Sequence, residues 1–215
     1  VADGDLGEWA DSGIMPFVID PSTGGVWASV DDEADLSATV YLAIDDDYIY
    51  FAADVIDDDY HFGEGNWYDQ DALQLFLGLY DSRGPKHNSI MRGDVPDYIL
   101  YATENTLQMD NPGGVSIGNS DEEHYHFEMF DPDYVVEGKI SLDTLALLSG
   151  DPRFHPANGM KVPIDIYFHD NDNGTWEGNV GYSTLATDQQ WNNPGEWSFT
   201  WIGDQSTVLG SDNEA

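Results

Sequence analysis

The feature of this sequence that most constrains its fold is a repeated two-residue alternation of apolar and polar side chains. It is clearest in residues 39–44 (Thr-Val-Tyr-Leu-Ala-Ile) and 48–55 (Tyr-Ile-Tyr-Phe-Ala-Ala-Asp-Val). Successive side chains of a β-strand point to opposite faces, so the alternation predicts two strands. Three aspartates at 45–47 separate them, as is typical of a turn. The sequence therefore predicts an antiparallel hairpin here.

Six further segments alternate in the same way or form short apolar runs, at 72–79, 97–102, 124–130, 134–140, 162–168 and 195–202. Only the segment near 141–149 favours a helix, with Ser141 as N-cap and Gly150 at its end. Many short strands with turn-rich connections predict an all-β fold, an antiparallel β-sandwich of jelly-roll or immunoglobulin-like topology with at most one short helix. We expect one domain over residues 1–209 and a polar linker or tail at 210–215.

The charge of the chain is extreme, because 42 acidic residues face 6 Lys plus Arg and give a formal net charge of −36. A polyanion repels nucleic acid and anionic lipid, which argues against both as partners. Bound divalent cations or a saline medium would offset the self-repulsion. We therefore expect calcium (Ca²⁺), a secreted or cell-surface location and a marine or halophilic source. A solvated acidic surface without metal is the alternative.

The cysteine content, the longest apolar stretches and the last residues give further expectations about the class of protein. There is no cysteine, which excludes disulfides and thiol catalysis. No stretch approaches the roughly 18 apolar residues of a membrane span. The polar, linker-like residues 210–215 are typical of a domain that is part of a larger multidomain chain.

Three acidic segments are candidates for holding calcium, which prefers oxygen ligands from loops. In residues 170–174, Asp170 and Asp172 alternate with asparagines before a glycine, as in an EF-hand-like loop, although no flanking helices are predicted. Asp57 and Asp59 follow a predicted strand, and Asp3 lies in a weaker Asp-Gly-Asp segment. An acidic turn without an ion is the alternative in each case.

Aromatic residues flanked by polar hydrogen-bonding groups occur in three predicted loops, at 65–70, 173–177 and 188–194. The apolar face of a pyranose stacks on an indole, and its hydroxyls need donors and acceptors around the rim. Each tryptophan alone is more often a loop anchor, but three such loops together favour carbohydrate binding.

Catalytic alternatives have weaker support in the sequence. It contains no nucleophile elbow, phosphate-binding loop or His-Glu-x-x-His motif. Paired carboxylates for glycoside hydrolysis are abundant, but nothing distinguishes one pair. His124 and His126 share one face of a predicted strand, which suits either a transition metal or solvent exposure. We expect no enzymatic activity.

The order of the motifs resembles that of family 9 carbohydrate-binding modules and the wider group of DOMON-like β-sandwich domains. The resembling segments are the Asp-Gly-Asp-Leu-Gly-Glu-Trp start, the hairpin at 41–51, the acidic loop at 57–59, the segment 67–77, and the late loops at 170–172 and 190–194. Together they cover nearly the whole chain.

The resemblance implies a β-sandwich with structural calcium that holds a sugar, often at a chain end, between two aromatic rings. Carried over by position, one ring is Trp191 and the other is Trp67 or Tyr68. Gln74 stands where the family often has a sugar-binding glutamate, and Asp188 where it has an asparagine. Tyr101 or Leu100 stands near a family arginine that this chain lacks.

Two further functions remain open from the sequence. Haem-binding relatives use methionine with histidine or lysine, and Met91, Met109 and Met129 are available, though no motif fixes a pair. A calcium-rigidified structural or adhesive spacer in a surface protein is the other alternative. The expected ligand is a poly- or oligosaccharide.

Overall fold

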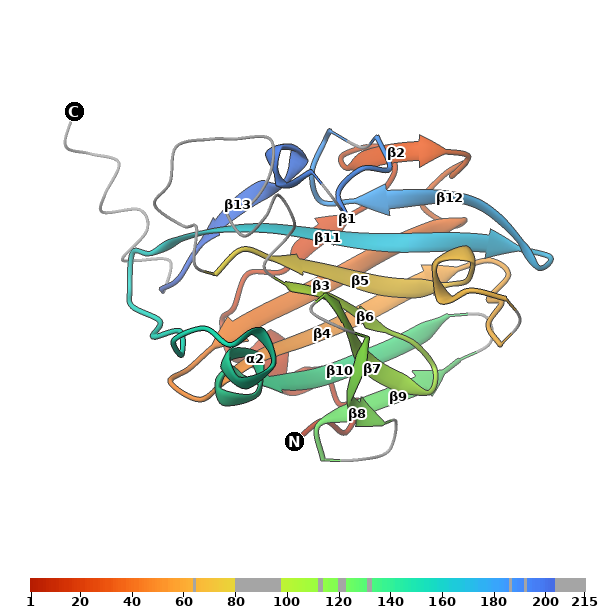
Figure 1. Cartoon of the computed structure of the whole chain (residues 1–215). Coiled ribbons are helices and arrows are strands. Elements are labelled where there is room, and N and C mark those ends of the chain that lie inside the picture. The colour runs from red at the N-terminus through yellow and green to blue at the C-terminus, as the bar shows by residue number, and fades with distance from the viewer. Residues whose placement is uncertain are drawn as a thin grey trace.

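The computed structural model of the chain describes residues 1–63, 65–79, 98–111, 114–119, 123–130, 133–185, 187–191 and 193–203, with backbone alone at 67 and 111. Two antiparallel sheets pack face to face and form a sandwich (Figure 1). This confirms the predicted fold class. The predicted linker at 210–215 lies outside the described residues.

The smaller sheet has five strands in the order β1-β3-β4-β10-β9. Their bounds are β1 Phe17–Ile19, β3 Leu36–Ile44, β4 Tyr48–Asp57, β10 Tyr134–Ser141 and β9 Tyr125–Met129. The predicted hairpin joins β3 and β4, with Ile44 opposite Ile49. Asp45 closes its turn, because its Oδ1 accepts hydrogen bonds of 2.7 Å from the N–H groups of Asp47 and Tyr48.

The larger sheet has eight strands, with seven in the order β2-β12-β11-β5-β6-β7-β8 and β13 also paired to β11. Their bounds are β2 Gly25–Ala28, β12 Thr175–Gly181, β11 Lys161–Asp172, β5 Ala72–Leu77, β6 Tyr98–Ala102, β7 Thr106–Asn111, β8 Val115–Asn119 and β13 Ser198–Trp201. β12 pairs with one end of β11 and β13 with the other, so β11 spans the sheet.

Four short helical segments complete the described chain: α1 Gly7–Asp11, α2 Leu142–Ser149 and the 3-10 turns η1 Trp67–Asp69 and η2 Pro194–Glu196. The predicted helix is α2, in which Ser141 caps the N-terminus and Gly150 adopts a left-handed conformation at the end. The five-residue α1 was not expected. No helix among the described ranges is long and apolar enough to cross a membrane.

The core lies between the sheets and is filled by alternate side chains of both. Phe51 and Val136 come from the smaller sheet, and Leu75, Leu100 and Phe168 from the larger one. The other side chains of β5, β6 and β11 point to the outer face of the larger sheet. Most of these outward residues are polar or aromatic, which makes the outer face the first place to look for a binding site.

Candidate functional site

A row of polar and aromatic side chains crosses the outer face of the larger sheet. Gln74 on β5 lies opposite Tyr167 on β11 and Tyr101 on β6. Residues directly opposite in antiparallel strands share a face, so these three side chains are neighbours. All three are buried, although they point away from the core. Leu100 instead faces the core, so of the two residues near the family arginine only Tyr101 belongs to this row.

Hydrogen bonds connect this row to the loop after β12. His169 Nε2 lies 3.2 Å from Oε1 of Gln74. Asn179, opposite His169 on β12, donates from Nδ2 to Oδ1 of Asp188 at 3.4 Å. Burial of His169 lowers the pKa of its imidazole to about 4, so the ring is neutral at physiological pH. Gln74 and Asp188, both predicted to contact sugar, thus belong to one polar group of side chains, of which Gln74, His169 and Asn179 are buried.

Trp191 stands next to this surface and is 53% exposed. Its Nε1 donates to the carbonyl oxygen of Asp188 at 3.2 Å, which fixes the indole against the loop. Asp188 itself has a left-handed backbone with a φ of 54°, so the chain turns sharply there. The structure therefore brings the predicted residues Gln74, Tyr101, Asp188 and Trp191 to one region of the outer face.

The second predicted ring comes from the turn η1. Tyr68 is about half exposed there, whereas the side chain of Trp67 lies outside the described part of the structure. η1 packs on β11, and the side-chain amide of Asn171 on β11 donates to the carbonyl oxygen of Asp69. Tyr68 is thus held at the end of β11 that also carries His169.

One further exposed ring lies on the same face and carries no signal in the sequence. Trp27 on β2 is 41% exposed and lies opposite Asn179, whose side chain contacts Asp188. β2 has only four residues, Gly-Val-Trp-Ala, and was too short to be recognised as a strand. Tyr167, His169 and Asn179 were missed as well, because their importance depends on cross-strand neighbours.

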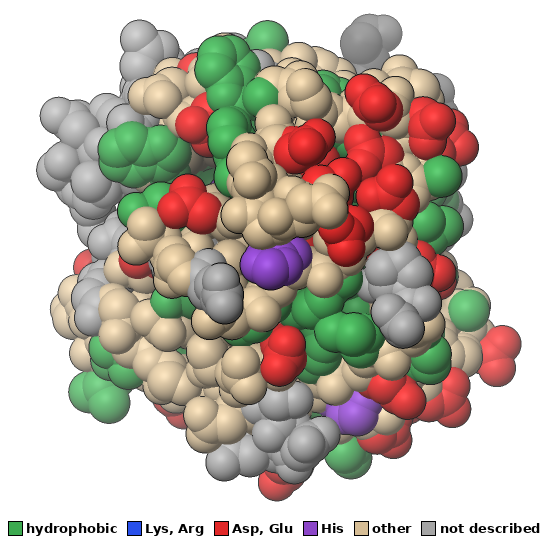
Figure 2. All heavy atoms as spheres, turned by 90° about the vertical axis from the view of Figure 1, so that its right-hand side faces the viewer, with side chains coloured by type: hydrophobic (Ala, Val, Ile, Leu, Met, Phe, Trp, Pro, Cys, Tyr) green, Lys and Arg blue, Asp and Glu red, His purple; other side chains and the backbone are tan. Residues whose placement is uncertain are grey.

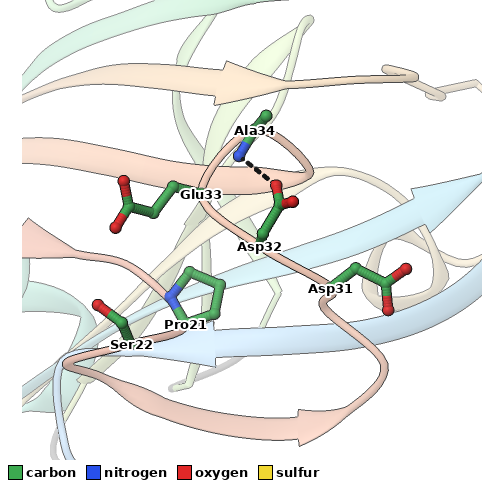
Figure 3. Close-up of a pocket in the computed structure, with 6 residues that line it drawn as sticks. All are labelled: Pro21, Ser22, Asp31, Asp32, Glu33 and Ala34. Atoms are coloured by element: carbon green, nitrogen blue, oxygen red, sulfur yellow. Dashed lines mark hydrogen bonds between the residues drawn. The ribbon is translucent and has the colours of Figure 1, made fainter.

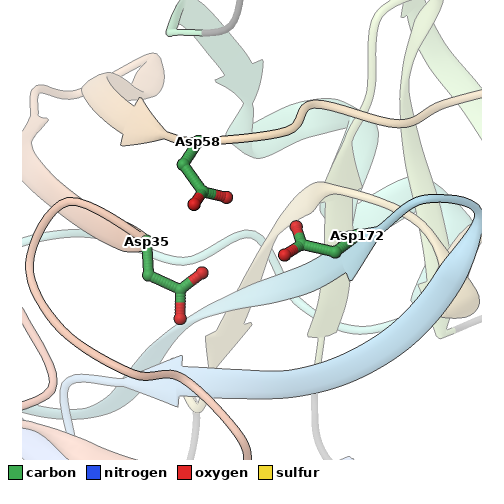
Figure 4. A group of neighbouring side chains, drawn as sticks. All are labelled: Asp35, Asp58 and Asp172. Carbon is green, nitrogen blue, oxygen red and sulfur yellow. The ribbon is translucent and has the colours of Figure 1, made fainter.

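Acidic side chains gather at the end of the molecule where the β11–β12 hairpin projects (Figures 1 and 2). Asp35, before β3, Asp58, after β4, and Asp172, at the end of β11, point toward one another (Figure 4). One carboxylate oxygen from each lies within 4.8 Å of the others. Three segments distant in sequence thus meet in one cluster, and two of them contain predicted calcium ligands.

Two buried carboxylates adjoin this group. Asp170 is 1% exposed, and neither of its carboxylate oxygens has a hydrogen-bond partner among the described residues. The same holds for Oδ2 of Asp57, while its Oδ1 accepts from the N–H of Asp59. Burial, and then nearby carboxylates, raise the pKa of Asp57 to about 7 and that of Asp170 to about 8. We call Asp35, Asp57, Asp58, Asp170 and Asp172 the acidic cluster.

The segment 170–174 is not the free loop that its sequence suggested. Asp170 and Asp172 are part of β11, and Asn173 and Gly174 form a two-residue hairpin turn with φ values of 54° and 74°. Asp59 supports this turn, because its Oδ2 accepts a 2.8 Å hydrogen bond from the N–H of Asn173.

Asp3, the fifth predicted ligand, lies elsewhere. Its N–H donates to Oε2 of the buried Glu137 at 2.8 Å, and Trp9 Nε1 donates to the other oxygen of Glu137 at 2.9 Å. Asp133 marks the position of the acidic cluster, because its Oδ1 accepts a hydrogen bond from the N–H of Asp57. Glu137 lies four residues further along the chain, on β10. Four strand residues span about 13 Å, so Asp3 is well separated from the acidic cluster.

Comparison with protein families gives one decisive match. A family model described as "Carbohydrate family 9 binding domain-like" matches residues 21–200. The chain belongs to this family. A search of curated proteins finds no match.

Solved structures of family 9 domains have the same fold as this family 9 chain. A family 9 module from Caldicellulosiruptor kristjanssonii in complex with cellotriose is 18% identical, with a TM-score of 0.65 over 100% of this chain and 92% of that chain. A family 9 module from that organism in complex with glucose is 16% identical and has a TM-score of 0.65. The match covers 95% of this chain and 92% of that chain. A putative carbohydrate-binding protein from Bacteroides uniformis is 9% identical, with a TM-score of 0.57 over 94% and 93%.

A pocket of ≈ 450 Å³ also opens on this family 9 domain (Figure 3). It is lined by Pro21, Ser22, Asp31, Asp32, Glu33 and Ala34. Part of its lining, residues 31–34, directly precedes Asp35 of the acidic cluster. These lining residues offer no aromatic ring on which a pyranose could stack. The outer face with Trp191 therefore remains the better candidate for a sugar site.

The residues considered for other chemistry are dispersed in this family 9 domain. Met109 is buried in the core, Met129 is exposed on β9, and Met91 lies outside the described residues. His126 has its Nε2 3.7 Å from Oε2 of Glu128.

Proposed function

We propose that this family 9 domain is a non-catalytic carbohydrate-binding module that holds a sugar against Trp191. The observation that carries the proposal is the exposed indole of Trp191 next to the connected polar groups of Asp188, Asn179, His169 and Gln74. An indole supplies the apolar surface for a pyranose, and the half-buried Asp188 supplies hydrogen bonds at its rim. The buried side chains of Asn179, His169 and Gln74 lie beneath and support it. Tyr68 or Trp67 supplies the second ring.

Cello-oligosaccharides are the ligands that we propose for this site. Modules of the same family and fold are described in complex with cellotriose and with glucose. In this chain Tyr101 stands in the outer-face row near the position of the family arginine, so the site binds without that cation. Stacking and a few hydrogen bonds predict a micromolar dissociation constant, about −8 kcal/mol.

Calcium in the acidic cluster is the second part of the proposal. Asp170 and Asp57 support it, because buried carboxylate oxygens without hydrogen-bond partners are costly unless a cation compensates them. Asp35, Asp58 and Asp172 add further oxygen donors within coordination range of a common point. A bound Ca²⁺ would offset part of this charge and join β11 to β4 and to the segment before β3.

An extracellular location fits such a site, since extracellular calcium modules work at dissociation constants of about 0.1–1 mM. We therefore propose that the domain is secreted or displayed at a cell surface, as one module of a larger chain. A calcium-rigidified spacer is the second candidate function, because calcium bound in the acidic cluster would stiffen the fold even if the domain binds no sugar.

A glycan array with the wild-type domain and Trp191→Ala tests the proposed function. We expect the wild type to bind cello-oligosaccharides and the variant to lose that signal while keeping the wild-type melting temperature. An array without any glycan signal, combined with strong stabilisation by calcium, would favour the spacer.

A further inference from the structure

A second pair of rings, the exposed Trp201 and the half-buried Phe199, lies on the outer face at the opposite end of β11 from the loop that carries Trp191. Phe199 and Trp201 on β13 lie opposite Pro163 and Lys161 on β11. Lys161 Nζ is 4.0 Å from the ring centroid of Phe199 and 5.3 Å from that of Trp201. Trp201 is 47% exposed. We call Lys161, Phe199 and Trp201 the β13 platform.

The β13 platform faces the same way as the proposed sugar site. Thr200 lies opposite Val162, which is buried in the core, so its neighbours Phe199 and Trp201 point outward. Lys161 and Tyr167 are six residues apart on β11 and therefore on one face, about 20 Å from each other. Tyr167 is itself covered, because it packs with Phe76, Ile99 and Trp197 in a second hydrophobic cluster on this face. An extended ligand held at Trp191 would pass over this cluster and reach the platform along the direction of β11.

Lys161 contacts aromatic rings, whereas the other two cations that the structure describes form ion pairs. Lys139 pairs with Glu123, and Arg153 pairs with Asp47 and Asp143. Lys161 is exposed and contacts two aromatic rings, with no carboxylate in ion-pair range among the described residues. An ammonium group over ring faces fixes the rings by cation–π attraction and keeps donors for a ligand.

We propose that the β13 platform is a second sugar-binding subsite, which stacks a distal unit of a neutral polysaccharide chain whose other end is held at Trp191. The inference rests on the proposed function and extends it from a chain end to a longer stretch of polymer. A neutral chain is specified because a domain with a formal net charge of −36 repels polyanionic glycans.

Calorimetric titration with cellotriose and cellohexaose tests this inference on the wild type and Trp201→Ala. We expect the wild type to bind cellohexaose roughly tenfold more tightly than cellotriose, a difference of about 1.4 kcal/mol. Trp201→Ala should lose this gain and retain the wild-type affinity for cellotriose. Phe130→Ala is the matched control, because it removes an exposed ring next to β9 of the other sheet and should change neither affinity.

Two outcomes would overturn the subsite alone: equal affinity of the wild type for both lengths, or an unchanged length dependence in Trp201→Ala. Preferential binding of a polyuronate would overturn its assignment to a neutral chain. Failure of the wild type to bind either cello-oligosaccharide would contradict the proposed function as well, so the two claims fail in distinguishable ways.

Discussion

The N–H of Asn171 donates a 2.8 Å hydrogen bond to Oδ1 of Asp71, a buried carboxylate that also accepts from the N–H of His61. Asn171 lies between Asp170 and Asp172 of the acidic cluster, and its side chain holds the carbonyl of Asp69 in η1. One residue of β11 therefore links the proposed cation site to the turn that carries Tyr68.

This link predicts that calcium supports sugar binding without touching the sugar. Excess EDTA should weaken binding of cellotriose, because repulsion in the metal-free cluster loosens the end of β11 and with it η1. Asn171→Ala should weaken it in calcium too, since losing one hydrogen bond costs about 1 kcal/mol. Calorimetry in calcium and in EDTA measures both effects, and equal cellotriose affinity in the two buffers would contradict the coupling.

Asp170→Asn should change stability in opposite directions with and without calcium. In EDTA, at a pH above the raised pKa of Asp170 of about 8, the variant removes one of several crowded buried charges, so it should unfold at higher temperature than the wild type. In calcium it loses a ligand and should be less stable than the wild type by about 1–3 kcal/mol. Asp54→Asn is the control, because it makes the same charge change at an exposed site of β4. Identical behaviour of the two variants would contradict a metal role for Asp170.

We expect the buried Asp165 to make the free energy of unfolding depend on pH, independently of the acidic cluster. It is fully buried, and its Oδ1 accepts from the N–H groups of Ile166 and Ser183. Burial raises its pKa from 3.8 to about 7. The native state therefore binds more protons than the unfolded state between these values, and stability falls as pH rises through that window.

Asp165→Asn mimics the neutral acid, so it should remove this part of the pH dependence. Relative to the wild type, the free energy of unfolding of the variant should increase from pH 4 to pH 8, by at most about 4 kcal/mol. Urea unfolding of both proteins at a series of pH values measures this difference. A difference that does not vary with pH would mean that Asp165 is ionised throughout.

A strand is predictable from the sequence where its own residues carry the alternating pattern. The hairpin of β3 and β4 was predicted because alternating residues and Asp45 act locally. β13 is shorter than the segment predicted at 195–202, because Pro194–Glu196 forms a 3-10 turn before it. β1, β2, β7, β8 and β12 were missed, since they are short or their apolar pattern is interrupted by glycine and polar residues.

The acidic cluster and the surface near Trp191 show why short sequence motifs do not predict the full set of residues at a site. The sequence marked 57–59 and 170–172 as two separate calcium candidates, whereas the fold joins them with Asp35 in one cluster. Asp35 carries no motif of its own and is recruited only by the approach of β3 to β4 and β11. In the same way, Trp27 and His169 reach the Trp191 surface through strand pairing that no short motif encodes.

The most direct test of the account is calorimetric titration of cellotriose into the wild type, Trp191→Ala and the control Phe130→Ala, all in calcium. We predict micromolar binding by the wild type and by Phe130→Ala, and at least a tenfold loss in Trp191→Ala with an unchanged melting temperature. Wild-type affinity in Trp191→Ala would contradict the central claim that this indole holds the sugar.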